Sequence, residues 1–334
     1  MRKYSSLFSQ LLKFFPRIEF ENMVKKRFAE FGSKGFTCWQ QFVSMLFSQL
    51  GNANSLSEIT NGLATCEGKL RHLGIKAPRK STLAYANTHR PWELYQDVFF
   101  SMLEKTRVIA SSLKRKFRFK NKLYSIDSSV IDLCLSMYEW ARFRRTKGAV
   151  KLHLRLDHDG YLPDYAIITD GKRHDAKVAH LFNYNPGSIT VFDRAYVDYN
   201  LFLLRIVTYY DEDGDRTLIF LTNNMKLAAV TIAMIYKERW EIELFFKSLK
   251  QNLKIKSFVG TSSNAVKIQI WTALIAMLIL KYLKLNSCFG WSLSNLAALL
   301  RMNLFTYRDL WSWIDKPFET VPVQEESIQM ELIF

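Results

Sequence analysis

The hydrophobic pattern of this 334-residue chain changes at Leu123, and that change constrains the fold more than any other feature of the sequence. From residue 4 to about 113, apolar residues recur three or four positions apart, as in WQQFVSMLFSQL from Trp39, which predicts helices. From Leu123 on, short runs rich in β-branched and aromatic residues alternate with turn residues, which predicts strands. These runs are LYSIDSSVIDLCL, VKLHLRLDHDG, YLPDYAIIT and SITVFDRAY.

The order of the predicted elements indicates an α/β fold. A helix is expected between the third and fourth runs, a β-hairpin near 205–222 offers its second arm as a fifth strand, and one long helix follows over about 226–254. This order predicts a mixed five-stranded sheet with flanking helices. We place an all-helical N-terminal domain at 1–118, the sheet domain with its short hairpin insertion at 119–285, and a C-terminal helical tail at 286–334.

The charge of the chain points to a polyanionic partner. Lys and Arg number 47 against 31 Asp and Glu, a net charge of +16, and the commonest polyanion is nucleic acid. The best apolar run, IQIWTALIAMLIL from Ile268, covers 13 residues, which is too short to cross a bilayer and predicts a buried helix. The four cysteines form no CxxC pair, so we expect neither zinc nor disulfides, and a cytoplasmic location without a membrane partner.

Two segments are candidates for DNA contact, each with a structural alternative. Short helices from Ser55 and Lys80, joined by LRHLGIKAPR, fit either a helix-turn-helix-like DNA reader or a helical bundle with a basic loop. The loop between the first two strands is strongly basic and is either a solvated hairpin or, as we favour, a DNA-contacting one. Its basic residues are Arg142, Arg144, Arg145, Lys147 and Lys151.

The segment YKERWEIELFFKSLK, from Tyr236, carries charges at regular helical spacing. On a wheel of 3.6 residues per turn, Tyr236, Arg239, Glu243 and Lys250 fall within an arc of about 60°. An apolar stripe lies next to that arc. A salt-bridged solvent face is the ordinary interpretation of such spacing, but Tyr236, Arg239 and Lys250 suit contacts with phosphate better than contacts with one another.

Two further carboxylates stand where predicted strands end. Asp127 closes KLYSID, and Asp193 closes SITVFD before a chain reversal. With Glu243 on a packed helix they would make a set of three oxygen donors able to hold two Mg²⁺ ions, which activate an attacking oxygen and stabilise a leaving one in phosphodiester displacement. Other aspartates of the same region are alternatives to this trio: Asp132, Asp157, Asp159, Asp164, Asp170 and Asp175.

The pattern Tyr-x2-Arg-x3-Glu-x6-Lys, at Tyr236, Arg239, Glu243 and Lys250, resembles the YREK signature of bacterial insertion-sequence transposases of the DDE class. SID, ending at Asp127, and VFDRAY, around Asp193, resemble the motifs of that family's first and second aspartates, and the resemblance runs over the length of the chain.

The resemblance implies an RNase H-like core and cut-and-paste transposition by cleavage and strand transfer at inverted-repeat ends. It implies that Asp127, Asp193 and Glu243 bind two Mg²⁺ ions, for which Mn²⁺ can substitute. It further implies contacts of the other three signature residues with double-stranded DNA at the transposon ends, a homodimer in the synaptic complex, and a nucleoid-associated place in the cytoplasm.

The chain departs from this family in one respect. Only 49 residues separate Asp193 from Glu243, where relatives with the signature carry a substantial β-rich insertion. Either the chain is a compact variant or an internal segment has been lost. The alternatives to an active transposase are therefore a catalytically defective copy that binds transposon ends as a repressor, and a cellular nuclease with the same core.

Overall fold

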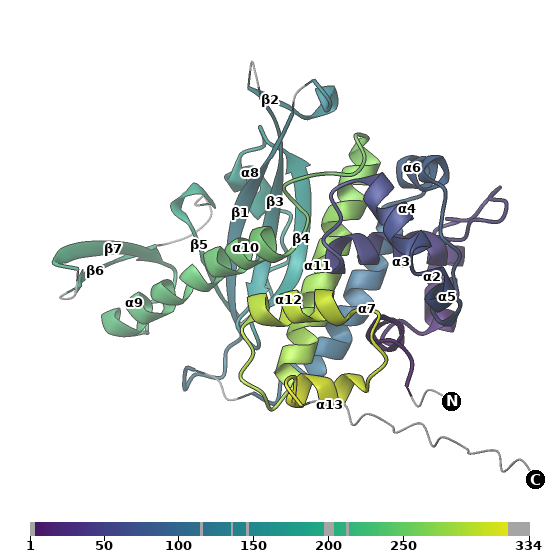
Figure 1. The fold of residues 1–334 in the computed structure, drawn as a ribbon. Coiled ribbons are helices and arrows are strands. Elements are labelled where there is room, and N and C mark those ends of the chain that lie inside the picture. Colours follow the sequence, from purple (N-terminus) through teal and green to yellow (C-terminus); the bar gives the residue numbers. More distant parts are fainter. Residues whose placement is uncertain are drawn as a thin grey trace, which may run out of the picture.

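Figure 1 shows the computed structural model of the protein, in which the N-terminal third is helical, as predicted. The structure describes residues 4–113, 116–134, 136–144, 147–196, 204–211 and 214–319. The helices of the N-terminal part are α1 (Leu7–Leu12), α2 (Arg17–Lys26), α3 (Cys38–Leu50), α4 (Leu56–Ala64), α5 (Glu67–Leu70), η1 (Arg71–Leu73), α6 (Lys80–His89) and α7 (Glu93–Ala110). Side-chain caps begin three of them: Ser6 caps α1, Thr37 and Gln40 form a reciprocal capping box at α3, and Ser55 caps α4.

The four predicted β runs all form strands of one mixed sheet. Its order is β2-β3-β1-β5, with β4 also paired to β3. β3 is antiparallel to both β1 and β4, whereas β5 is parallel to β1. The strands are β1 (Leu123–Leu133), β2 (Arg142–Arg144), β3 (Lys147–Asp157), β4 (Leu162–Asp170) and β5 (Ile189–Phe192).

The two faces of this sheet are covered differently, and side chains alternate between them. On one face, Leu152 and Leu154 of β3 belong to the main hydrophobic core, which also contains residues of α10 (Trp240–Asn252) and α11 (Ser263–Asn286). The other face has a smaller cluster around Ile126, closed by the short helix α8 (Asp175–Ala179). This alternation determines which β1 side chains can meet α10.

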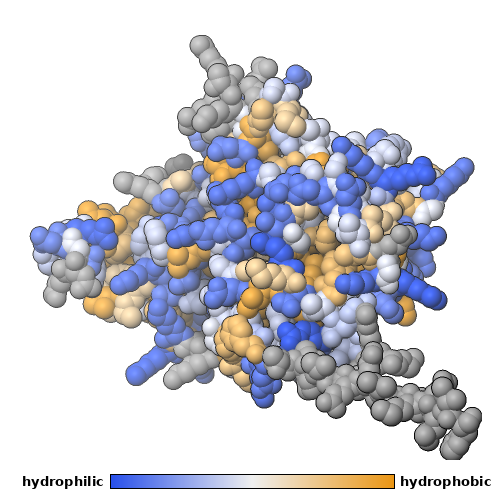
Figure 2. Space-filling model, in the orientation of Figure 1, coloured by the Kyte–Doolittle hydropathy of each residue, from blue (hydrophilic) through white to orange (hydrophobic). Residues whose placement is uncertain are grey.

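Within the described part of the chain, the hairpin arm that was predicted as the fifth strand does not join the main sheet, whose five strands include β2 instead. The hairpin is present, as β6 (Arg205–Asp211) and β7 (Arg216–Thr222), but in the described residues its arms pair with each other in a separate two-stranded sheet. Val207 and Phe220 of the hairpin are buried against α9 (Ala229–Glu238), so this helix, rather than the edge of the main sheet, holds the hairpin. The arm formed by β6, β7 and α9 projects from the body, and apolar side chains are exposed on it (Figures 1 and 2).

The predicted long helix is likewise two helices, α9 and α10, which meet at Arg239. At this junction the backbone N–H of Arg239 donates to the Tyr236 carbonyl and that of Ile242 to the Arg239 carbonyl, both three residues back instead of four. The two halves have different partners, since α9 packs on the hairpin and α10 on β1 and the main core. A single straight helix would have to pack on both of these surfaces along one axis.

The apolar run around Ile268 is part of α11, the central helix of the fold, which confirms the predicted buried helix. In the described part of the chain, α11 is also the one helix long and apolar enough to cross a membrane, and 83% of its apolar window is buried inside the protein. It packs against α7, α3 and α6 on one side and β4 and α10 on another, so one core joins the N-terminal helices to the sheet. The part of the chain predicted as a C-terminal helical tail contains α12 (Leu293–Asn303) and α13 (Leu310–Asp315).

Candidate active site

Asp127 and Asp193 come from neighbouring parallel strands. Ile126 of β1 lies opposite Phe192 of β5. Asp127 directly follows Ile126, and Asp193 directly follows Phe192. Neighbouring strands are about 4.8 Å apart, so this register brings the two carboxylates together. Asp127 lies on the sheet face that α10 covers, because the alternate residues Leu123 and Ile131 of β1 are buried on that side.

Glu243 lies in the first turn of α10, and Arg239 joins it to Asp127. The Nη2 atom of Arg239 is 2.8 Å from Oε1 of Glu243, and its Nη1 atom is 3.6 Å from Oδ2 of Asp127. The Arg239 side chain is only 15% exposed, which strengthens both interactions relative to surface ion pairs. Arg239 therefore acts as the internal counter-ion of two of the three predicted carboxylates.

The pKa of Asp127 reflects the nearby charges of the other two predicted carboxylates. Burial raises the pKa of Asp127 to about 6, and the charges of Asp193 and Glu243 act in the same direction. The backbone N–H of Ser128, which donates to Oδ1 of Asp127 at 2.7 Å, and the Arg239 guanidinium oppose the rise. Like-charged acids crowded at one place are typical of catalytic and metal-binding sites.

Tyr236 and Arg239 lie together beside the carboxylates. The guanidinium carbon of Arg239 is 5.5 Å from the centre of the Tyr236 ring, and this ring packs on Phe220 of the hairpin at 4.9 Å. Burial opposes the charge of Arg239, but Tyr236, Glu243 and Asp127 outweigh it, so the pKa of Arg239 is raised. The hairpin thus supports the signature residues through Tyr236.

Lys250 does not lie with the other three signature residues. Its Nζ atom donates to the backbone carbonyl of Val130 at 3.0 Å, three residues beyond Asp127 on β1. At the rise of a strand this places the ammonium group about 10 Å along β1 from Asp127. Lys250 is therefore suited to a phosphate further along a bound strand, and not to the reacting centre itself.

This geometry agrees with what comparison with known proteins shows. Residues 118–279 match the family model of the transposase DDE domain. The match includes both aspartates and Glu243. Residues 3–76 match a second family model, a domain of unknown function (DUF4372), which leaves the helix-turn-helix hypothesis for the N-terminal part a prediction.

Three curated proteins with similar sequences carry transposase names. A putative transposase, y4zB, of Sinorhizobium fredii is 29% identical over 61% of this chain and 71% of its own length. The probable transposase of insertion sequence element IS5377 of Geobacillus stearothermophilus is 25% identical over 63% and 68%. A putative transposase of element IS4SA of Synechocystis is 24% identical over 61% and 71%. Together these findings support a DNA transposase of an insertion sequence, and the DDE domain implies an RNase H-like fold.

The donor chemistry of the DDE domain fits a divalent metal ion, although its geometry is not yet that of a metal site. Asp127, Asp193 and Glu243 offer carboxylate oxygens, the ligands that Mg²⁺ prefers. Within the described residues, however, no group of three or more His, Cys, Asp or Glu side chains is arranged to hold a metal ion, and Arg239 bridges two of the acids. Metal binding by the trio therefore requires the guanidinium to withdraw from between them.

The basic residues predicted to contact DNA are only partly described. Arg145 lies outside the described residues, and the structure describes only the backbone of Arg142, Arg144 and Lys147, at the β2–β3 connection. Lys151 lies within β3 instead of a loop, and its Nζ atom is 3.3 Å from Oδ1 of Asp175 and donates to the Arg173 carbonyl at 3.2 Å. The ammonium group of Lys151 is thus paired within the protein, and its contact with DNA stays a prediction.

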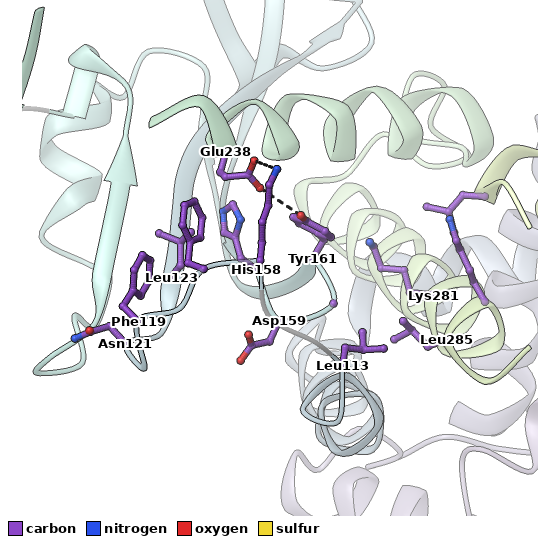
Figure 3. Close-up of a pocket in the computed structure, with 15 residues that line it drawn as sticks. Leu113, Phe119, Asn121, Leu123, His158, Asp159, Tyr161, Glu238, Lys281 and Leu285 are labelled. Atoms are coloured by element: carbon purple, nitrogen blue, oxygen red, sulfur yellow. Dashed lines mark hydrogen bonds and ion pairs between the residues drawn. The ribbon is translucent and has the colours of Figure 1, made fainter. Parts of the chain in front are cut away.

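A cavity of about 250 Å³ is lined in part by Glu238, at the end of α9 (Figure 3). Glu238, the last residue of α9, is buried there and accepts hydrogen bonds from Lys116 at 2.5 Å and from the Tyr161 hydroxyl at 3.3 Å. The ring of His158 in the cavity wall lies 2.7 Å from the Ser125 hydroxyl. The sequence analysis did not single out Glu238, because one more acid in a charged helix gives no signal of burial.

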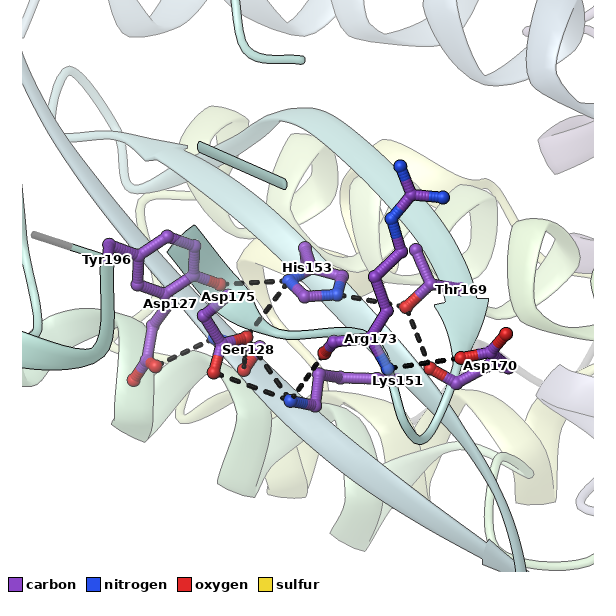
Figure 4. Close-up of polar contacts among 9 residues, drawn as sticks. All are labelled: Asp127, Ser128, Lys151, His153, Thr169, Asp170, Arg173, Asp175 and Tyr196. Atoms are coloured by element: carbon purple, nitrogen blue, oxygen red, sulfur yellow. Dashed lines mark hydrogen bonds and ion pairs between the residues drawn. The ribbon is translucent and has the colours of Figure 1, made fainter. Parts of the chain in front are cut away.

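Sequence analysis also missed a set of polar residues on the opposite sheet face, directly behind Asp127 (Figure 4). They are Ser128, His153, Thr169, Asp175 and Tyr196. One signal was present: Tyr196 ends the VFDRAY segment that contains Asp193. The contacts among the others join β1, β3, β4 and α8 and depend on strand register, which the sequence does not state.

Proposed function

We propose that this protein is a DDE transposase that cleaves and transfers DNA strands at the inverted-repeat ends of its own insertion sequence. The observation that carries the proposal is the convergence of Asp127, Asp193 and Glu243 on one sheet face, inside the part of the chain that matches the DDE domain. The assignment of an RNase H-like fold is part of the proposal. Strands β4, β3, β1 and β5 would correspond to the first four strands of that fold, and in the described residues no further strand pairs with β5 on its other side.

In this proposal the three carboxylates hold two divalent ions, Mg²⁺ or Mn²⁺. When bound, such ions activate an attacking water or 3′-hydroxyl and stabilise the leaving oxygen of the phosphodiester. Of the chain's own residues, Arg239 turns from the carboxylates to a DNA phosphate, and Tyr236 donates a hydrogen bond from its hydroxyl to the same strand. Lys250 and the basic β2–β3 connection bind phosphates further away, in double-stranded transposon-end or target DNA held by a homodimer.

The second candidate is a copy that binds transposon ends without cutting them. It is favoured by the short Asp193–Glu243 interval, which holds only 49 residues. Ile206 and Ile219 on the hairpin are each more than 60% exposed. If an internal segment has been lost, it would have covered these two apolar side chains.

Cleavage of a labelled duplex that ends in the inverted repeat flanking this gene separates the two candidates. The wild-type protein is expected to nick the element end with Mg²⁺ or Mn²⁺, and Glu243→Gln to lower the rate about 1,000-fold or more while DNA binding persists, because a metal ligand is lost. Glu241→Gln is the matched control, since it removes the same charge from the same helix turn, near Lys116 and Lys281 instead of the trio. Wild-type binding without cleavage in either metal would assign the chain to the non-cutting candidate.

A further inference from the structure

The residue that follows Asp127 connects the two faces of β1. The backbone N–H of Ser128 donates to Oδ1 of Asp127 at 2.7 Å, and its hydroxyl donates to Oδ1 of Asp175 at 2.9 Å. Asp175 is the first residue of α8, and its Oδ1 atom also lies 3.3 Å from the Nζ atom of Lys151. The position of the first aspartate is thus tied to a polar network behind the sheet (Figure 4).

Tyr196 ties the second aspartate to the same network. It ends the short helix η3 (Arg194–Tyr196), and its backbone N–H donates to the carbonyl of Asp193 at 3.0 Å. Its hydroxyl lies 3.0 Å from Nδ1 of His153, a side chain with no exposed surface in the middle of β3. The two rings meet edge to face, with centroids 6.2 Å apart.

The hydrogen-bonded group around His153 also includes Asp175. Nδ1 of His153 lies 3.0 Å from the Tyr196 hydroxyl and 3.3 Å from Oδ1 of Asp175, and Nε2 lies 3.0 Å from the Thr169 hydroxyl. The Tyr196 hydroxyl is hydrogen-bonded to Asp175 as well. Burial lowers the pKa of His153 to about 4, so the ring is neutral near pH 7.

The place of Asp193 needs such an anchor because its strand is short. β5 has four residues and, in the described part of the sheet, pairs with β1 alone. The chain turns directly after Asp193 into η3, and Tyr196 is buried against Ile126 and Phe182. The hydroxyl bond to His153 therefore sets the orientation of the turn that presents the second carboxylate to the first.

We propose that Tyr196 is a positioning residue: through its bond to His153 it holds the Asp193 carboxylate at the distance from Asp127 that a shared divalent ion requires. This inference rests on the proposed function. Outer partners that orient metal-binding side chains change metal affinity by about 10- to 100-fold when removed. A tyrosine that only filled the core would give no such effect on loss of its hydroxyl, because phenylalanine has the same ring.

The test compares Tyr196→Phe with Tyr184→Phe in the full chain. Tyr184 also donates its hydroxyl to one acceptor, the Ala179 carbonyl at 2.8 Å, but on the exposed side of α8. Binding of Mn²⁺ is measured by electron paramagnetic resonance, and DNA cleavage is measured against Mn²⁺ concentration. Tyr196→Phe is expected to raise the Mn²⁺ concentration for half-maximal binding and for half-maximal cleavage about 10-fold or more, and Tyr184→Phe to change neither.

Thr169→Val is a second variant, at the far end of the network, and removes the hydroxyl that is hydrogen-bonded to His153 Nε2. We expect a smaller rise, about 2- to 5-fold, in the same direction. Unchanged Mn²⁺ affinity in Tyr196→Phe, or an equal change in Tyr184→Phe, would overturn the positioning role. If the wild-type protein binds Mn²⁺ but does not cleave, the transposase proposal fails while binding still tests Tyr196; if it binds no Mn²⁺, the positioning inference falls as well.

Discussion

Asp127→Asn is expected to abolish metal-dependent DNA cleavage, with a loss of about 1,000-fold or more, and at the same time to make the metal-free protein more stable. The two effects have one cause. Burial and the neighbouring acids raise the pKa of Asp127 to about 6, against 3.8 for an isolated group. The ionised carboxylate is therefore less stable in the folded protein than in the unfolded chain, and its charge lowers the free energy of unfolding. Asparagine has the same shape and no charge.

The sign of the stability change follows from proton linkage. Because the folded state binds the Asp127 proton more tightly than the unfolded state does, stability is lost as the pH rises from about 4 to 6. Asp127→Asn should therefore gain about 2 kcal/mol above pH 6 and nothing below about pH 4. Thermal melting in a chelating buffer at pH 4 and pH 7.5 measures this.

Asp132→Asn provides the control, because Asp132 lies on the same strand but is exposed, near Lys250. It should leave both the melting temperature and cleavage close to wild type. A loss of stability in Asp127→Asn at pH 7.5 would contradict the account of Asp127 as a buried, charge-crowded acid.

Trp271→Ala is expected to cause the largest loss of folding stability, about 3–5 kcal/mol. Trp271 of α11 is 1% exposed, and its ring packs on Phe99 of α7 at 5.1 Å and stacks on Trp92 at 6.3 Å. Removing it leaves a cavity where the N-terminal helices meet the central helix of the fold. Equilibrium unfolding in urea measures the change.

Trp240→Ala is the matched substitution, because Trp240 is 56% exposed at the start of α10 and buries little area to lose. A change below about 1 kcal/mol is expected there. If Trp271→Ala were as mild, the N-terminal helices would not depend on α11 for their packing, and the single core described above would have to be divided.

Much of the fold could be predicted from the sequence because strands and helices have different hydrophobic periods. The change of period at Leu123, the four β runs, the hairpin and the buried helix around Ile268 all appear where their patterns place them. The choice of two aspartates from eight candidates stays a prediction, and its strand-end argument is only half right. Asp193 directly follows β5, as predicted, whereas Asp127, which was predicted to close a strand, lies within β1 beside the end of β5. The position of Glu243 followed from helical spacing.

The failures occur where two distant surfaces compete for one segment. Local periodicity gave no sign that the segment around Arg239 packs on two different sheets, so the break between α9 and α10 was missed. For the same reason β7 was assigned to the main sheet, although it pairs with β6 and packs on α9.

The sequence by itself determined which side chains are candidates for chemistry: two aspartates in β-type segments and a glutamate on a helix, in a strongly basic chain. Only the tertiary structure decided how they are held, with Arg239 between two of the acids, Lys250 on the β1 backbone, and Tyr196 on a buried histidine. Residue identity and period are local properties of the chain. Charge compensation and hydrogen-bond direction instead depend on which distant atoms meet, and that is settled only when the strands take their register and the helices pack.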